Sequence, residues 1–192
     1  MKKLSIEDLW SLEEYSKRRP AFRAEAIDRK RARTVCVGPN VTFLFEDNLT
    51  IRYQVQEMLR IEKTFERDGI QAELDAYNPL IPDGKNLKAT MLIEYPDEAE
   101  RKQALSRLVG IEHQVWLEAR NEKANAIADE DIPRSNNAKT SAVHFLRFEL
   151  SPSMTEKVKL GEQLTLKVAH PNYTAQTLLS RGQSAELGRD LD

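Results

Sequence analysis

The sequence predicts an α+β fold: a largely antiparallel sheet of about six to seven strands packed by a long central helix, with an N-terminal helical pair before it. Helical and β-type segments do not alternate strictly along the chain, which argues against a doubly wound parallel sheet. Two pairs of β-type runs are each separated by a few turn residues, as in hairpins. One long segment carries the apolar period of an amphipathic helix.

The N-terminal part is expected to be helical. Ser5 and Asp8 form a variant of the capping box, and Pro20 is expected to begin a second helix that ends near Arg33. The next two β-type runs, residues 34–37 and 41–45, surround a Gly-Pro-Asn turn, so we expect them to pair as a hairpin.

Residues 48–67 form the longest predicted helix, which Gly69 is expected to end. Its apolar residues fall in one arc of the helix: Ile51, Val55, Met58, Ile61 and Phe65. The polar residues opposite this arc should face water: Arg52, Gln56, Arg60 and Lys63. Gln54 and Glu62 interrupt the apolar arc, so we expect both side chains to point toward the core.

The remainder of the chain is predicted mainly as strands. After a short helix near residues 72–77, residues 78–84 form a rigid surface loop with two prolines and an Asp-Gly pair. The later elements are, in order, a strand (87–95), a helix (97–109), a hairpin (113–120 with 124–129), a strand (141–150), a short helix (152–160) and a strand (163–169). Residues 171–192 are expected to be a C-terminal tail, either helical or frayed.

The length of 192 residues fits one domain, which we assign to residues 1–170, with a helical part at 1–33 and the sheet with its packing helices at 34–170. A composition of 40% apolar and 31% charged residues is typical of a soluble globular protein. The single cysteine excludes an intramolecular disulfide. There is no run of about 18 apolar residues, and acidic residues follow the start closely, so we expect a cytoplasmic protein without a membrane segment or signal peptide.

Familiar motifs for catalysis or cofactor binding do not occur in the sequence: it has no glycine-rich phosphate loop, HExxH zinc motif, CxxC pair or GxSxG elbow. We therefore predict no cofactor and no metal. Glu112, His113 and His170 could bind a metal if the fold gathered them, and the Asp-Glu-Asp run at 129–131 could hold a hard cation, but the spacing requires neither. Cys36 lies in a β-branched run, so we expect a small buried hydrophobe there.

The strand predicted at 141–150 carries the most informative polar residues. Strand alternation puts His144 on one face and Arg147 on the other, each among large apolar residues. A buried guanidinium needs a carboxylate or water, and Arg147 has Glu149 as a local partner and Glu62 as a long-range one. His144 is either a core histidine bonded to a backbone carbonyl, or a ligand or general base.

These residues suggest one candidate pocket. If the long helix packs on this strand, their polar side chains would meet beside the loop at 78–84 and could orient a carboxylate or phosphate ligand. The candidate residues are Gln54, Glu62, Asp83, His144, Arg147 and Glu149.

A basic segment lies near the N-terminus. Residues 17–33 contain eight Lys or Arg against Glu25 and Asp28, a local charge of +6 (eight minus two) in a chain of net charge −2. Such a segment could meet nucleic-acid phosphates or an acidic partner, or it could be a solvated face balanced by the acidic remainder of the fold. It lacks the interleaved aromatic residues of a base-stacking surface, which argues against nucleic acid.

Five long blocks carry a family resemblance: 45–59 (FEDNLTIRYQVQEML), 77–97 (YNPLIPDGKNLKATMLIEYPD), 110–113 (GIEH), 126–131 (AIADED) and 139–150 (KTSAVHFLRFEL). On these blocks the chain resembles the bacterial domain-of-unknown-function family numbered 3501, a family of uncharacterised single-domain proteins. The resemblance implies a gene setting beside rubrerythrin-like and iron–sulfur oxidoreductase proteins, and hence a redox or oxidative-stress context. It implies no catalytic residue, and Cys36 lies outside the blocks.

The sequence therefore favours a non-catalytic accessory or interaction protein. We expect a homo-oligomer that serves a redox system through an iron–sulfur or rubrerythrin-like partner. The first alternative is an enzyme or small-anion binder that uses Glu62, His144 and Arg147. The second alternative is nucleic-acid binding through residues 17–33.

Overall fold

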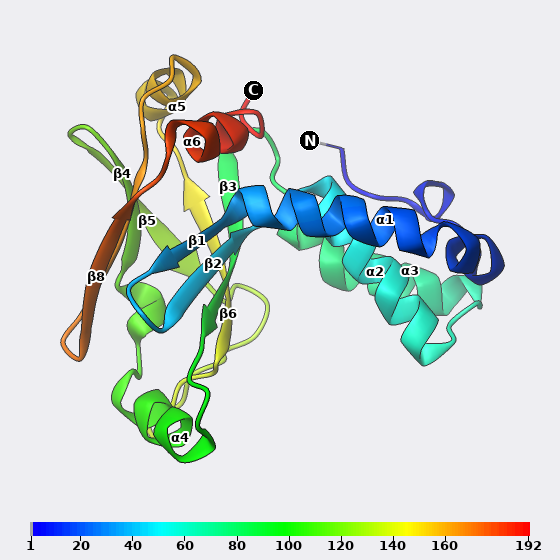
Figure 1. The fold of residues 1–192 in the computed structure, drawn as a ribbon, viewed down its shortest axis with the longest axis horizontal. Helices are drawn as coiled ribbons and strands as arrows, with labels where there is room; N and C mark the ends of the chain where they lie inside the picture. Colours follow the sequence, from blue (N-terminus) through cyan, green and yellow to red (C-terminus); the bar gives the residue numbers. More distant parts are fainter. Residues whose placement is uncertain (1) are drawn as a thin grey trace.

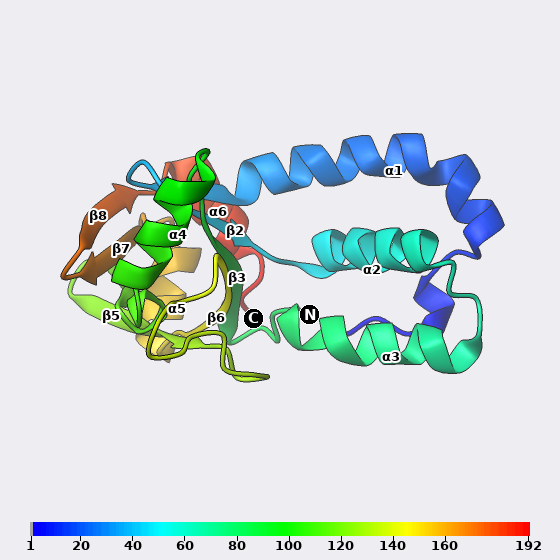
Figure 2. The same ribbon diagram turned by 90° about the horizontal axis from the view of Figure 1, so that it is seen from below.

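The computed structural model describes residues 2–192, which form a β-barrel and a helical arm that extends from one side of it (Figures 1 and 2). These residues contain eight strands: β1 (Thr34–Val37), β2 (Val41–Phe45), β3 (Asn86–Ile93), β4 (Val115–Ala119), β5 (Glu122–Ala128), β6 (Val143–Glu149), β7 (Thr165–His170) and β8 (Tyr173–Leu178). They also contain six α-helices: α1 (Leu12–Arg33), α2 (Asn48–Glu62), α3 (Arg67–Tyr77), α4 (Glu98–Arg107), α5 (Pro152–Lys159) and α6 (Arg181–Gly188). Three short 3-10 helices complete the elements: η1 (Ile6–Asp8), η2 (Asn78–Leu80) and η3 (Ile111–His113). Across this part of the chain, every helix is too short or too polar to span a bilayer.

The strands form a single antiparallel sheet in the order β1-β2-β3-β6-β5-β4-β7-β8. The predicted α+β class and antiparallel sheet are confirmed. The predicted number of strands is too low, because the sequence pattern suggested a helical or frayed tail where β8 lies. Along β8, half-buried and exposed residues alternate, which is the period of a strand and not of a helix. The last residues do form a helix, α6, and its Leu187 is buried against the barrel core.

Side chains close the barrel between its first and last strands. The Tyr173 hydroxyl of β8 donates a hydrogen bond to the Val37 carbonyl (2.6 Å) and accepts one from the Asn40 amide (3.2 Å). The Thr177 hydroxyl donates to the Cys36 carbonyl (2.7 Å). Gly38 is required at this seam, because its φ is +71° and an added Cβ would lie 2.5 Å from the Tyr173 hydroxyl oxygen. The sheet thus curls until side-chain hydrogen bonds join β1 to β8.

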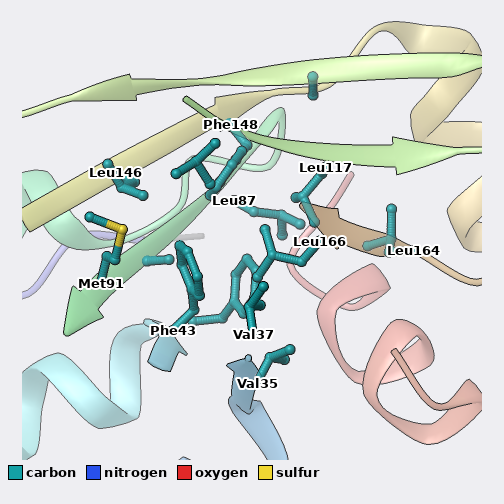
Figure 3. Close-up of a cluster of buried hydrophobic side chains, with 14 of the residues drawn as sticks. Val35, Val37, Phe43, Leu87, Met91, Leu117, Leu146, Phe148, Leu164 and Leu166 are labelled. Atoms are coloured by element: carbon teal, nitrogen blue, oxygen red, sulfur yellow. The ribbon is translucent and has the colours of Figure 1, made fainter. Parts of the chain in front are cut away.

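The interior of the barrel is a packed hydrophobic core (Figure 3). Burial alternates along each central strand, so one residue in two contributes to the core. The core includes Val35, Val37, Phe43, Leu87, Met91, Leu117, Leu146, Phe148, Leu164 and Leu166. Because Val35 and Val37 point inward, Cys36 between them points outward and is exposed. The expectation that Cys36 is buried is therefore wrong.

The arm has a smaller core of its own. Helices α1, α2 and α3 lie side by side with α2 in the middle (Figure 2), and the N-terminal segment packs across them. The buried residues of the arm core are Leu4, Ile51, Val55, Leu59, Leu74 and Ile81. The long predicted helix was expected to pack on the sheet. Instead, the apolar side of α2 is buried by α3 and the N-terminal segment, away from the barrel.

Two predicted helix boundaries are wrong. Pro20 lies inside α1 and does not begin a second helix. An interior proline removes its backbone donor and crowds the carbonyl four residues earlier, so it costs helix stability. The helix continues because the residues around Pro20 favour a helix and because Tyr15, Phe22 and Ala26 are buried along it. The helix predicted at 48–67 ends at Glu62, where Lys63 adopts a left-handed conformation (φ 55°). Gly69 then lies in the first turn of α3 instead of ending a helix.

The exposed and buried faces of α2 also differ in part from the prediction. Gln56, which was expected to face water, is fully buried: its side chain accepts a hydrogen bond from the Trp10 amide (2.8 Å) and donates one to the Trp10 carbonyl (3.3 Å). The N-terminal segment covers this face, which a helical period alone cannot reveal. At the far end of α2, Ile61 is 60% exposed and Glu62 is exposed.

A buried arginine joins the arm to the barrel. The side chain of Arg33, at the end of α1, is 0% exposed. Its Nε donates to the Phe45 carbonyl (2.8 Å) and its Nη2 to the Glu46 carbonyl (3.1 Å). The guanidinium also pairs with the Asp190 carboxylate, just after α6, and lies 3.4 Å from Glu186 Oε1. Four segments of the chain therefore meet at one guanidinium: α1, the end of β2, α6 and the C-terminus.

Removal of the Arg33 charge should destabilise the fold strongly. We expect Arg33→Met to lower the free energy of unfolding by about 3–5 kcal/mol, because Asp190 would be left buried without its cation. The double variant Arg33→Met/Asp190→Leu should recover most of this loss, since it removes both charges. Urea unfolding of the two variants and the wild type checks this. A loss below about 1 kcal/mol in the single variant would contradict it.

The same pair predicts a pH dependence. Burial raises the pKa of Asp190 from 3.8 to about 6, although hydrogen bonds from Arg33 oppose the rise. The folded protein then binds this proton more tightly than the unfolded chain does, so Asp190 lowers stability as the pH rises from 3.8 to about 6. Unfolding free energies of wild type and Asp190→Asn, measured across this window, should diverge by about 3 kcal/mol. Parallel curves would contradict the assignment.

Candidate functional site

Strand β6 carries the two polar residues that the sequence singles out, and it places them on opposite faces of the barrel wall. His144 is buried with Leu146 and Phe148 on the inner side, and Arg147 is half-buried with Phe145 on the outer side. The alternation of the strand therefore separates these two residues, as predicted, and each has its own set of partners.

Arg147 is saturated by two carboxylates. Its Nε and Nη2 donate to the two oxygens of Glu130 (2.7 and 2.6 Å), and its Nη1 pairs with Glu149. The predicted local partner, Glu149, is thus confirmed, whereas Glu62 is not a partner. Hydrogen bonding to Glu130 raises the pKa of Arg147, and hydrogen bonding from Arg147 lowers that of Glu130. The guanidinium stays charged with its donors largely occupied.

Neighbouring strands extend this ion-pair cluster. Lys88 of β3 lies opposite Arg147 in the strand register, and burial together with the nearby guanidinium lowers its pKa. Asn86, two residues earlier, donates to Glu149 Oε1 (3.2 Å) and accepts from the Asp83 amide (3.4 Å). Three of the predicted residues, Asp83, Arg147 and Glu149, therefore lie in one cluster.

A cleft of about 340 Å³ opens beside this cluster, between the arm and the barrel. The arm contributes Asp75, Ala76, Pro79 and Leu80, and the barrel side contributes Lys88, Glu130, Asp131, Phe145, Leu146 and Arg147. The loop at 78–84 was expected at the rim of a pocket with Arg147, and two of its residues, Pro79 and Leu80, line this cleft. The cleft thus has apolar residues on both sides, with one charged residue, Asp75, on the arm and four charged residues on the barrel side.

His144 lies in a separate, buried network at the end of the barrel near α4. Its Nδ1 is 2.6 Å from Asp129 Oδ2, and its Nε2 is 2.8 Å from the Thr140 hydroxyl and 3.1 Å from the Ser141 carbonyl. The Thr140 hydroxyl is in turn 3.3 Å from Glu112 Oε2. The histidine therefore has the backbone carbonyl partner expected of a core residue, and a carboxylate besides.

Thr140, His144 and Asp129 form a chain of hydroxyl, imidazole and carboxylate groups. A nucleophile and the base that activates it have the same arrangement in many enzymes. However, Thr140 is 2% exposed and His144 is 0% exposed, so a substrate cannot reach either group in this conformation. The Thr140 amide also donates to the Leu105 carbonyl of α4. The arrangement therefore anchors the loop between β5 and β6 over the end of the barrel.

Glu112, Asp129 and His144 could also be considered as metal ligands, because one atom of each lies within 4.8 Å of the others. Asp129 holds the Nδ1 side of the ring, whereas Glu112 approaches the Nε2 side at 4.0 Å. The two carboxylates thus face different ring nitrogens, and Arg134 lies 3.4 Å from Asp129 Oδ1. This geometry suits a hydrogen-bonded histidine better than three ligands that converge on one ion.

His113 and His170, which the sequence offered as possible metal ligands, have other contacts in the structure. The Nε2 of His170 is 3.1 Å from the Val109 carbonyl, and its Nδ1 accepts from the Asn172 amide (3.2 Å). His113 is exposed, with its Nε2 3.8 Å from Glu112 Oε1.

The acidic run at 129–131 connects the two sides of β6. Asp129 points to His144, Glu130 to Arg147, and Asp131 to Arg134 at 2.5 Å. Asp129 adopts φ 48°, a left-handed conformation that lets its Oδ1 also accept from the Phe145 amide (3.0 Å). The run suggested a possible cation site, and each of its carboxylates contacts a histidine or an arginine of the protein.

Two of the predicted site residues lie elsewhere. Glu62 is exposed on the last turn of α2, in the arm, and with burial it raises the pKa of Glu73. Gln54 is half-buried on α2. The structure thus does not bring Glu62, His144 and Arg147 into one pocket. Lys88 was not predicted as a site residue. The sequence signal that could have found it is one cation among the mostly apolar or small residues of strand β3.

The carboxylate of Asp129 should matter more than that of Asp131. We expect Asp129→Asn to lower the free energy of unfolding by about 2 kcal/mol, because an amide has one acceptor oxygen and cannot accept from both His144 and the Phe145 amide, as the two carboxylate oxygens do. Asp131→Asn removes an exposed ion pair to the same Arg134 and should cost less than about 1 kcal/mol. Urea unfolding of both variants decides this, and equal losses would show that the His144 network is not an anchor.

Comparisons with known proteins agree with the fold. The family model described as "Protein of unknown function (DUF3501)" matches residues 3–191. No functionally curated protein matches the chain. A crystal structure described as a novel protein of unknown function from Burkholderia pseudomallei K96243 is similar over 100% of both chains, with 50% sequence identity and a TM-score of 0.95. The resemblance found on the sequence blocks is therefore confirmed, and the chain belongs to the DUF3501 family.

Proposed function

We propose that this chain is a non-catalytic accessory protein that docks a partner protein at the cleft between the arm and the barrel. The observation that carries the proposal is the lining of the cleft, which combines an apolar wall of Ala76, Pro79 and Leu80 with charged groups, of which Glu130, Asp131 and Arg147 are held in ion pairs. An apolar wall with fixed charges at its edge is typical of a protein-docking surface.

The charges of the cleft favour a basic contact from the partner. Its lining has three carboxylates, Asp75, Glu130 and Asp131, against the two cations Lys88 and Arg147. Within residues 2–192, the Asp75 carboxylate accepts one hydrogen bond, from the side-chain amide of Gln71, and has no ion pair. A partner segment that presents an apolar side chain beside a lysine or arginine would match this pattern. A small anion gains little here, because Glu130 and Glu149 already occupy Arg147.

The setting of this docking function is also part of the proposal. The family resemblance implies neighbours of the rubrerythrin-like and iron–sulfur oxidoreductase kinds, so we take an oxidoreductase of this kind in the cytoplasm as the partner class. Any iron would then belong to the partner. Self-association into a homo-oligomer is compatible with this role and can be measured separately by light scattering.

The alternative of nucleic-acid binding through residues 17–33 loses support from the ion pairs of α1. Arg19 pairs with Glu57, Arg29 with Asp47, and Arg33 with Asp190. On the outer side of the helix, Lys17, Arg18 and Arg31 pair with acidic residues of α1 itself. Most of the local charge is thus neutralised within the fold and is not free to meet phosphates.

Site-specific photocrosslinking tests the proposal. A photoreactive residue at Leu80, in the cleft, should give an adduct with one partner of defined mass in cells that express the full chain. The same residue at Lys102, exposed on α4, is the matched control and should give none. Asp75→Lys should weaken the Leu80 adduct about tenfold, because it repels a basic contact. Equal adducts at the two positions, or an adduct unchanged by Asp75→Lys, would contradict the cleft as the docking site.

A further inference from the structure

A second binding feature lies on the arm, apart from the cleft. The guanidinium of Arg52, on α2, stacks on the ring of Trp10 with its Cζ 4.1 Å from the ring centroid. Arg18 of α1 lies over the same ring at 5.2 Å. We propose that Arg52, stacked on Trp10, forms a binding site for a single oxyanion, either a carboxylate or a phosphate group.

The site rests on a fixed platform. The backbone of Trp10 is held on both sides by the fully buried Gln56, through the two hydrogen bonds between them. The Trp10 ring packs edge-on against Phe22 at 5.0 Å between centroids. Arg52 also lies 5.6 Å from the centroid of Phe22. The plane of the guanidinium is therefore set by aromatic contacts before any ligand binds, which lowers the entropic cost of binding.

Arg52 differs from most buried or half-buried arginines of residues 2–192 in having no carboxylate partner. Arg101 also lacks one, but it donates to the Tyr95 carbonyl (3.5 Å). Five buried or half-buried arginines each pair with an acidic side chain: Arg19, Arg29, Arg33, Arg134 and Arg147. Within residues 2–192, no carboxylate oxygen lies within 4.0 Å of the Arg52 guanidinium nitrogens. Its Nε is a buried donor without any hydrogen-bond partner in the same part of the chain.

An unpaired, partly desolvated guanidinium is unfavourable, and a bound anion would relieve this. Burial lowers the pKa of Arg52, and the more distant Asp8 and Glu25 only partly oppose the effect. Because the Nε atom is buried, an anion would reach the guanidinium at its two Nη nitrogens. A carboxylate or phosphate would accept hydrogen bonds from the planar fork of Arg52 in a charge-assisted contact.

The surroundings favour one anionic group over a nucleic acid. Glu14 already pairs with Arg18, so the net positive charge around the ring is small and a polyanion gains little long-range attraction. The face of Trp10 is covered by a guanidinium, which leaves less aromatic surface for base stacking. The site is thus suited to an acidic side chain or a phosphate group, and it is independent of the proposed cleft.

Fluorescence of Trp10 tests this inference. The chain has two tryptophans, so Trp116→Phe leaves Trp10 as the single reporter in the full-length protein. Titration with inorganic phosphate or with a triglutamate peptide should change its emission in a saturable way, and comparison of the two distinguishes a phosphate from a carboxylate ligand. Arg52→Gln should weaken binding by about tenfold or more. Arg52→Lys should weaken it as well, because an ammonium lacks the planar fork.

Arg31→Gln is the matched control, since it removes one exposed arginine from the same arm. It should leave the titration unchanged, and urea unfolding should show that Arg52→Gln still folds. Three results would overturn the proposal: no response to either probe at millimolar concentration, equal loss of binding in Arg31→Gln, or tighter binding of a single-stranded oligonucleotide than of either probe.

Discussion

The burial of one guanidinium, that of Arg33, sets how the two parts of this protein are joined. A charge removed from water needs several acceptors at once, and no single segment of a small protein can supply them. Here the backbone at the end of β2 and the carboxylates of α6 and the C-terminus supply them together. Helix α1 must therefore end where the barrel and the C-terminal residues meet. The position of the arm follows from this requirement, and the cleft between arm and barrel follows from the position of the arm.

The second organising feature is the wall of the barrel at β6. Successive side chains of a strand point to opposite faces of the sheet. His144 and Arg147 therefore lie in different environments although they are only three residues apart. The acidic run at 129–131 provides carboxylates to both sides and to the loop residue Arg134. The inner network holds the loop over the barrel, and the outer one forms the charged edge of the cleft. One short acidic segment thus connects loop anchoring with the candidate docking surface.

The parts of the fold that depend on local sequence patterns could be predicted from the sequence. The hairpin of β1 and β2, the strand β6 and the pairing of Arg147 with Glu149 all depend on residues close in the chain. Features that depend on a distant covering segment could not be predicted. The helical period of α2 shows that one side is apolar, but it cannot show that the N-terminal segment buries Gln56 or that the last turn of α2 leaves Glu62 exposed to water. Lys88 is connected to Arg147 only through the register of β3 and β6, which the sequence does not state.

The buried contacts of Arg33 should hold the arm and the barrel in one fixed arrangement. Spin labels at Ile61→Cys on the arm and Leu178→Cys on β8, both exposed positions, in a Cys36→Ser chain would report the distance between the two parts by pulsed dipolar spectroscopy. We expect one narrow distance distribution, which broadens when Arg33 is replaced by methionine. A broad distribution in the chain that retains Arg33 would contradict it.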